Sequence, residues 1–125
     1  DMAYPATNIP AMAGADCLNT TQTYPQKTRW EMLDPEGEYE DIYNRYCHIR
    51  ASLGSKTMLE LVSTDYVEVT LSPEDLKKLN IRYIVSTNDF DEKIAAGTTN
   101  IFTDSGIEFQ KYYEGTQLSI YGCVY

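Results

Sequence analysis

The stretch Ser72–Ser86, SPEDLKKLNIRYIVS, predicts a short helix followed by a strand. Ser72 offers a hydroxyl for the N-cap, Pro73 stands at the first helical position, and two acids follow in the first turn. Two leucines give the helix an apolar face, and Asn80 suits a left-handed residue at its end. The run Ile81–Ser86 then has the composition of a buried strand.

Five other stretches show the alternation or the turn punctuation that is typical of strands. They are residues 47–53, 58–62, 66–71, 107–113 and 117–124. We expect the first three to form a meander or hairpin region and the last two to form a closing hairpin. The third strand, the helix after Ser72 and the strand after Asn80 predict an α/β element, although about nine connecting residues are few for a standard crossover.

Short helices are expected at residues 27–33 and, as at most one turn, within residues 90–95. The sequence therefore predicts an α+β fold with a mixed, largely antiparallel sheet and a few short helices. A chain of 125 residues and 14.2 kDa has room for one domain. We expect residues 27–125 to form that domain, with residues 1–26 as an extended segment that packs on it.

The charge balance restricts the partners of this domain. Nineteen acids against ten bases leave a net charge of −9, which repels phosphate backbones and anionic lipid head groups. Nucleic acid is therefore excluded as a partner. The chain begins at Asp1 without a signal peptide and has no apolar run of about 20 residues, so we expect a fragment of a longer protein or a mature form.

Metal and cofactor sites are not expected. Cys17, Cys47 and Cys123 have no CxxC spacing, and His48 is the only imidazole that could join them in a zinc site. Buried free thiols are the favoured interpretation, and one disulfide with a leftover thiol is the alternative. The acidic run Asp34–Asp41 lacks the residue order of an EF-hand, so we expect a solvated turn rather than a calcium site.

Catalysis by this chain alone is not expected either. Cys47 and His48 are neighbours in a predicted strand, so their side chains point to opposite faces and cannot form a dyad. Paired carboxylates occur by chance in a chain with 19 acids. The sequence contains no GxGxxG, GxxxxGK[ST], HExxH or GxSxG motif. We therefore expect no catalytic residue.

The candidate ligand-contact residues are Tyr39, Tyr43, Tyr46 and Arg45. The tyrosines are spaced four and three apart, which places their rings along one face of a helix. Such a stripe can bind sugars or peptides, but it more often covers a core, and we expect at least two of the rings to be mostly buried. Arg45 follows five acids and is expected to pair with one of their carboxylates in a bidentate fork.

Two sequence patterns resemble those of a known family of membrane proteins. Trp30–Pro35, WEMLDP, and Tyr43–Ile49, YNRYCHI, are similar to a pattern "W-x-x-L-D-P … YNRYAHI". Leu71–Ser86 resembles the segment "dLkkLnVkYIls" of the same proteins. These are the YfhO-like and GT-C-like polytopic membrane proteins of bacteria, and the resemblance covers Trp30 to Tyr125.

The resemblance implies an α+β domain on the extracytoplasmic side of a bacterial cell membrane. It implies attachment to a many-helix body that transfers sugars from a polyprenyl-phosphate donor to cell-wall polymers, with catalytic acids in that body. The expected function is thus a non-catalytic extracytoplasmic accessory domain of a bacterial multi-pass membrane protein involved in cell-envelope glycan metabolism. Its expected partners are the membrane-embedded part of its own chain and cell-wall glycan. The alternative is a stand-alone surface module that binds carbohydrate or peptide.

Overall fold

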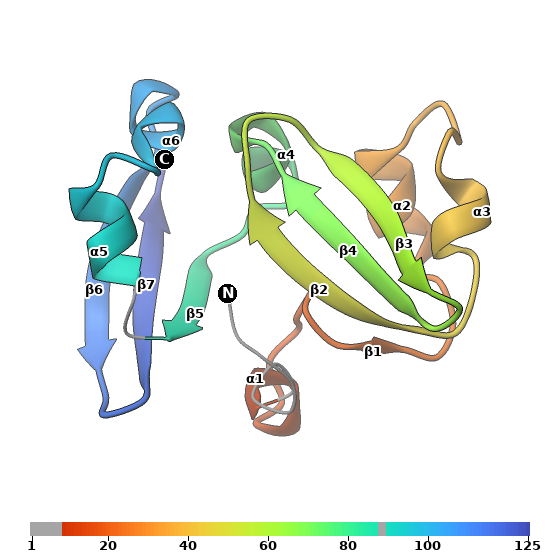
Figure 1. Ribbon diagram of the computed structural model, residues 1–125, viewed down its shortest axis with the longest axis horizontal. Helices are drawn as coiled ribbons and strands as arrows, with labels where there is room; N and C mark the ends of the chain where they lie inside the picture. The colour runs from red at the N-terminus through yellow and green to blue at the C-terminus, as the bar shows by residue number, and fades with distance from the viewer. Residues whose placement is uncertain (1–8, 88–89) are drawn as a thin grey trace.

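The computed structural model describes residues 9–87 and 90–125, and it contains two β-sheets side by side with short helices around them (Figure 1). The helices are α1 Ile9–Met12, α2 Lys27–Leu33, α3 Glu40–Tyr43, α4 Pro73–Lys78, α5 Phe90–Ala95 and α6 Asn100–Asp104. The strands are β1 Thr21–Gln22, β2 Cys47–Leu53, β3 Met58–Ser63, β4 Tyr66–Leu71, β5 Tyr83–Thr87, β6 Glu108–Glu114 and β7 Leu118–Val124. The predicted α+β class is confirmed, with the strands divided between two mostly antiparallel sheets.

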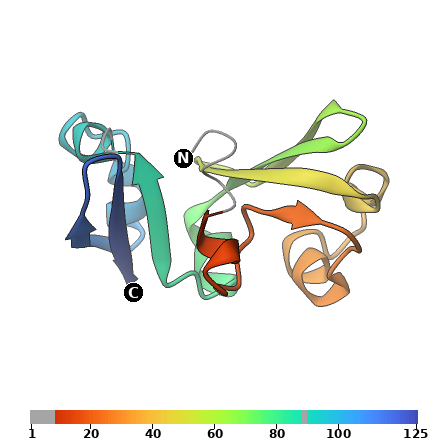
Figure 2. The same ribbon diagram turned by 90° about the horizontal axis from the view of Figure 1, so that it is seen from below.

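The larger sheet has the strand order β1-β2-β4-β3. β3 and β4 form the expected hairpin, but β4 lies between β2 and β3 and runs parallel to β2. A simple meander of the three strands is therefore wrong. One face of this sheet is apolar, and its buried residues are Cys47, Ile49, Leu59, Val67, Val69 and Leu71. Figure 2 shows α2 and α3 on one side of this sheet.

The smaller sheet has the order β5-β7-β6, and both pairs are antiparallel. The closing hairpin of β6 and β7 is confirmed, with each strand beginning one residue later than predicted. β4 and β5 belong to different sheets, so the predicted α/β element between them is wrong. The connection through α4 is too short to bring β5 back beside β4 in parallel, and it leads instead to a second sheet.

The helix α4 forms as its sequence predicts. The Ser72 hydroxyl accepts a hydrogen bond from the Asp75 backbone N–H at 3.2 Å, and Pro73 occupies the first turn. Asn80 has a φ of 51°, the left-handed conformation expected of it. The Ile81 N–H then donates to the Leu76 carbonyl at 3.2 Å, which delays β5 until Tyr83. The caps thus fix both the start of α4 and its exit toward the second sheet.

Two elements are not evident in the sequence. β1 is a two-residue edge strand that pairs with β2, within the segment for which the sequence predicts extended chain. α6 consists of Asn, Ile, Phe, Thr and Asp, which all have low helix propensity, and tertiary contacts hold it in place. Its Phe102 is buried, and the Phe102 carbonyl accepts a hydrogen bond from the Ile107 N–H at 2.8 Å. Packing therefore overrides local preference in α6.

No helix within residues 9–87 and 90–125 has both the length and the apolar composition needed to cross a membrane.

The core of the larger sheet contains one buried amide, the side chain of Gln22. Its Nε2 donates to the backbone carbonyls of Tyr43 and Arg45 at 2.8 and 2.9 Å, and also lies 3.6 Å from the Cys47 sulfur. Its Oε1 accepts from the Trp30 indole N–H at 2.7 Å. The Trp30 and Tyr43 rings stack with centroids 4.6 Å apart. We call this set the Gln22 network; it joins β1, α2, α3 and β2.

Gln22→Leu is expected to destabilise the protein strongly. Leucine has a similar volume but leaves the buried Trp30 indole N–H and the Arg45 carbonyl without the partner that Gln22 supplies, and each such group costs about 1–3 kcal/mol. The Tyr43 carbonyl keeps its hydrogen bond from the Arg45 N–H at 2.8 Å. We expect the free energy of unfolding to fall by about 3 kcal/mol or more, measured by urea denaturation. Gln117→Leu, at an exposed position, is the matched control and should leave the urea midpoint nearly unchanged. Equal midpoints for both variants would show that the network is dispensable.

Candidate functional site

The predicted tyrosine stripe is interrupted. Tyr39 and Tyr43 are half-buried and pack against the core as expected, and Tyr43 stacks on Trp30. Tyr46 is 53% exposed and meets the His48 ring edge-on, with centroids 5.8 Å apart. The helix α3 ends at Tyr43, because the chain turns there and enters β2. The expectation of three rings on one helix is therefore wrong, and Tyr46 alone presents a largely exposed ring.

Arg45 does not pair with a carboxylate, so the predicted fork is wrong. Its guanidinium donates to the backbone carbonyls of Asp41 at 2.6 Å and Thr64 at 3.2 Å. Its Nε is buried without a hydrogen-bond partner. The side chain thus joins the acidic turn and α3 to the turn between β3 and β4. The two carbonyls compete well with carboxylates for the Arg45 guanidinium, because the carbonyls are fixed in place whereas the nearby glutamates are exposed to water.

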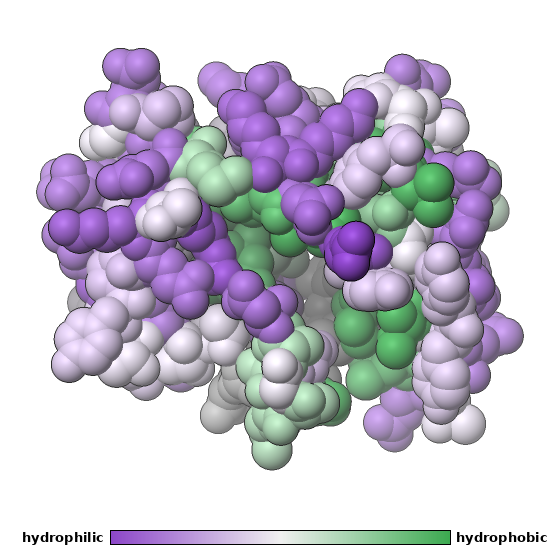
Figure 3. All heavy atoms as spheres, turned by 180° about the vertical axis from the view of Figure 1, so that it is seen from behind, coloured by the Kyte–Doolittle hydropathy of each residue, from purple (hydrophilic) through white to green (hydrophobic). Residues whose placement is uncertain are grey.

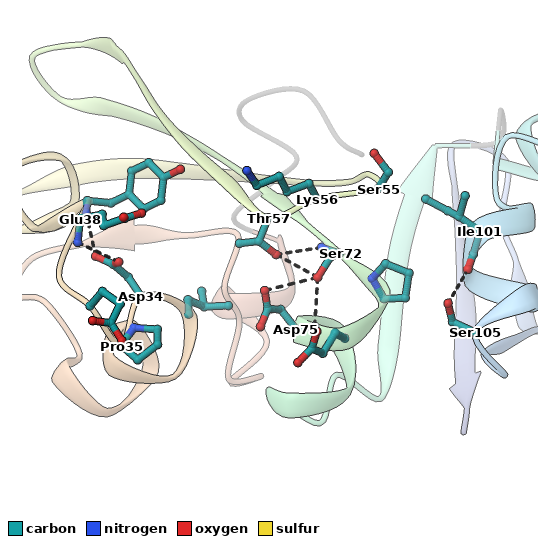
Figure 4. A pocket seen from close by; sticks show the side chains of 15 residues that line it. Asp34, Pro35, Glu38, Ser55, Lys56, Thr57, Ser72, Asp75, Ile101 and Ser105 are labelled. Carbon is teal, nitrogen blue, oxygen red and sulfur yellow. Dashed lines mark hydrogen bonds between the residues drawn. The ribbon is translucent and has the colours of Figure 1, made fainter.

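An open groove of about 600 Å³ runs from the acidic turn to α4 (Figure 4). Two buried carboxylates border it, and both are occupied within the fold. Asp34 accepts hydrogen bonds from the backbone N–H groups of Glu38 and Tyr39 at 2.9 and 2.8 Å, so it shapes the turn. Asp75 contacts the Ser72 hydroxyl and lies 3.3 Å from the Lys78 amine. These acids hold local structure, and the acids exposed to solvent in the turn are Glu36 and Glu38.

The residues typical of metal and nucleophilic sites are dispersed. Cys17, Cys47 and Cys123 are free thiols, and burial raises the pKa of Cys123 to about 11. His48 Nδ1 lies 2.9 Å from the Thr21 hydroxyl, on the sheet face opposite Cys47. Among the described residues, no three His, Cys, Asp or Glu side chains gather as metal ligands would. A thiol with a raised pKa is mostly protonated at neutral pH and is a poor nucleophile.

A second group of tyrosines, which was not among the residues expected from the sequence, lies on the smaller sheet. Tyr83 on β5 and Tyr112 and Tyr113 on β6 are 60%, 64% and 59% exposed. The Tyr83 and Tyr112 rings meet edge to face with centroids 5.9 Å apart. Gly122 lies beneath the Tyr112 ring, because a Cβ at Gly122 would come within 2.1 Å of it. We call Tyr83, Tyr112 and Tyr113 the outer tyrosine face.

A β-bulge builds part of this face. The pairing of β6 with β7 shifts between Lys111 and Tyr113, which leaves Tyr112 as the extra residue. In the view from behind, green apolar side chains show near the middle of the molecule and over the part that holds β5 to β7, among mostly purple hydrophilic ones (Figure 3). The adjacent tyrosines of β6 were the only sequence signal, and regular alternation would place them on opposite faces.

The other face of the smaller sheet is covered by α5. Asp91 on α5 accepts hydrogen bonds from the Lys111 amine and from the Tyr121 hydroxyl, the latter at 2.9 Å. The bond from Lys111, followed by that from Tyr121, lowers the pKa of the Asp91 carboxyl. Burial raises the pKa of Tyr121. This arrangement secures α5 to β6 and β7 through a charged residue rather than through apolar packing alone.

Asp91→Asn should reduce the acid sensitivity of the protein. A carboxyl whose pKa is lowered in the folded state stabilises the fold above its unfolded pKa of about 4 and loses that contribution as the pH falls through the folded value. The Asp91→Asn variant has no carboxyl at this position, so it does not lose this contribution as the pH falls. We therefore expect its melting temperature to fall less than the parent's between about pH 5 and pH 2.5. Asp104→Asn, which removes an exposed acid on α6, is the control for the loss of one negative charge. Equal pH dependence for Asp91→Asn and the parent would contradict this role.

Comparison with known proteins places the chain in a family without naming an activity. No curated protein matches it, and no solved structure matches it. A family model described as "Domain of unknown function (DUF7654)" matches residues 1–125, the whole length of the chain. The chain therefore belongs to the family described as Domain of unknown function (DUF7654).

Proposed function

We propose that this chain is a non-catalytic accessory domain on the extracytoplasmic side of a bacterial multi-pass membrane protein that serves cell-envelope glycan metabolism. The main support is the location of the residues that carry the resemblance to YfhO-like and GT-C-like proteins. Trp30, Leu33 and Ile49 lie in the core, and Asp34 holds the turn after α2. The shared residues therefore maintain a scaffold.

Residues of the second segment that carries the resemblance, Leu71–Ser86, also maintain the scaffold. Ser72 is the N-cap of α4, Asn80 takes the left-handed conformation after the C-cap Leu79, and Leu76 is buried in the core between the two sheets. These residues set where α4 starts, what it packs on and how it leads into β5. A scaffold of this kind is what an accessory domain requires. In this proposal, the partner is the membrane-embedded part of the same full-length chain.

The proposal predicts that the domain is accessible from outside intact cells. Tyr24 is 83% exposed, so Tyr24→Cys in the full-length parent provides a surface thiol. Burial raises the pKa of Cys17 and Cys47, which slows their own reaction with maleimides. We expect a membrane-impermeant maleimide to label the variant in intact cells as fully as in lysed cells. The parent with tyrosine at position 24 measures the background, and labelling only after lysis would contradict the proposal.

The outer tyrosine face favours a second candidate function, a carbohydrate-binding module. Three exposed rings on one sheet resemble a platform on which the apolar C–H face of a pyranose can stack, while hydroxyls and the exposed Gln110 amide supply hydrogen bonds. Tyrosine suits such amphipathic contacts because its ring is apolar and its hydroxyl is polar. In this candidate function, the ligand binds to the outer tyrosine face of the smaller sheet. It does not bind to Tyr39 and Tyr43, because these two side chains pack inward.

Two substitutions separate recognition from packing. Tyr112→Ala is expected to weaken binding of soluble peptidoglycan fragments at least tenfold in calorimetry, because one stacking ring is lost, with little change in melting temperature. Tyr43→Ala is the matched control: it removes the ring stacked on Trp30 and should lower the free energy of unfolding by about 3 kcal/mol or more. Failure of the parent to bind any glycan would eliminate the carbohydrate module and leave the accessory domain to the labelling test.

A further inference from the structure

The far edge of β3 is exposed and faces no described strand. β3 stands last in the order β1-β2-β4-β3, so only one of its edges is hydrogen-bonded within the described part of the chain. It is six residues long, and Leu59 is its only buried residue. Met58 and Val62 are 52% and 54% exposed. Natural proteins usually shorten, charge or cover such edges, because their free N–H and C=O groups accept another strand.

The charges beside this edge form an incomplete row. Register pairing places Arg50 beside Glu68 and Glu68 beside Glu60, so the three side chains lie in line on one face across β2, β4 and β3. The Arg50 Nε lies 4.0 Å from a Glu68 oxygen. Glu60, at the edge, has a like charge as its only described cross-strand neighbour. Such a pair is unfavourable unless a cation stands on its other side.

We propose that the free edge of β3 binds an extended peptide segment of alternating apolar and basic residues as an added strand. The backbone of β3 supplies the hydrogen bonds, as in other cases of strand addition. A lysine or arginine of the peptide stands opposite Glu60 and completes the row that begins at Arg50. Its apolar residues lie on the other face, beside Leu59 and Leu61.

Charge favours this occupant over a second copy of the chain. Two copies each carry a net charge of −9 and would bring two Glu60–Glu68 pairs to one interface. A basic segment gains attraction from the same carboxylates and from the overall field of the domain. The site is separate from the outer tyrosine face, which lies on the other sheet. It is also independent of the proposed accessory role, because either can hold without the other.

Synthetic peptides test the proposal on the intact chain. The probe is a seven-residue peptide of alternating valine and threonine with lysine at its centre; the comparison peptide has glutamate there. We expect the lysine peptide to bind about tenfold more tightly at low salt, and the difference to shrink as salt is added. NMR shifts of backbone amides should concentrate in residues 58–63. The same lysine peptide with alternate backbone nitrogens methylated should not bind, since it cannot pair as a strand.

Charge reversal provides the decisive comparison. Glu60→Lys should transfer the preference to the glutamate peptide, and it should fold because position 60 is exposed. Glu108→Lys makes the same change on the edge strand β6 of the other sheet and should keep the preference for lysine. The proposal is overturned by equal binding of the methylated peptide, by amide shifts confined to other residues, by no binding, or by a dimer of the chain that occupies this edge in sedimentation.

Discussion

A buried amide has to find its hydrogen bonds inside the protein, and the side chain of Gln22 meets this demand by joining four elements. It accepts from the Trp30 indole and donates to two carbonyls at the end of α3. Those carbonyls belong to the turn that leads into β2, so the amide sets where α3 stops and where the strand starts. β1 is short, but this side chain ties it firmly to the core. Much of the larger sheet therefore depends on one polar residue.

The connection through α4 places the second sheet. Ser72 and Asn80 limit the helix to a short segment, and the chain leaves it without the length needed to return beside β4. β5 consequently starts a new sheet, to which the final hairpin adds β7 and β6. Leu76 and Phe102 then continue the core from one sheet to the other. The division into two sheets is thus a consequence of local capping and chain length.

Local sequence patterns predicted the local structure but did not predict the contacts between residues far apart in the chain. Alternation located β2 and β4 within a residue, and the caps located α4, because these patterns act over a few neighbours. The insertion of β4 between β2 and β3 depends on pairing energies that no short window contains. The role of Gln22 was equally hidden, since its partners are 8 to 25 residues away in the chain. At the candidate site, spacing predicted the packing of Tyr43 but not the exposed rings created by the bulge at Tyr112.

Polar groups in the core and groups at two of the surfaces differ in how far the fold supplies their contacts. Inside, the buried carboxylates Asp34 and Asp75 have hydrogen-bond partners in the fold, and so does Gln22. Outside, the exposed rings of the smaller sheet and the free edge of β3 retain capacity for contacts that the described residues do not use. Stability requires the buried polar groups to have partners within the fold, whereas binding requires surface groups that can still make contacts. In the functions proposed above, recognition takes place at these surfaces, and the interior of the domain holds them in place.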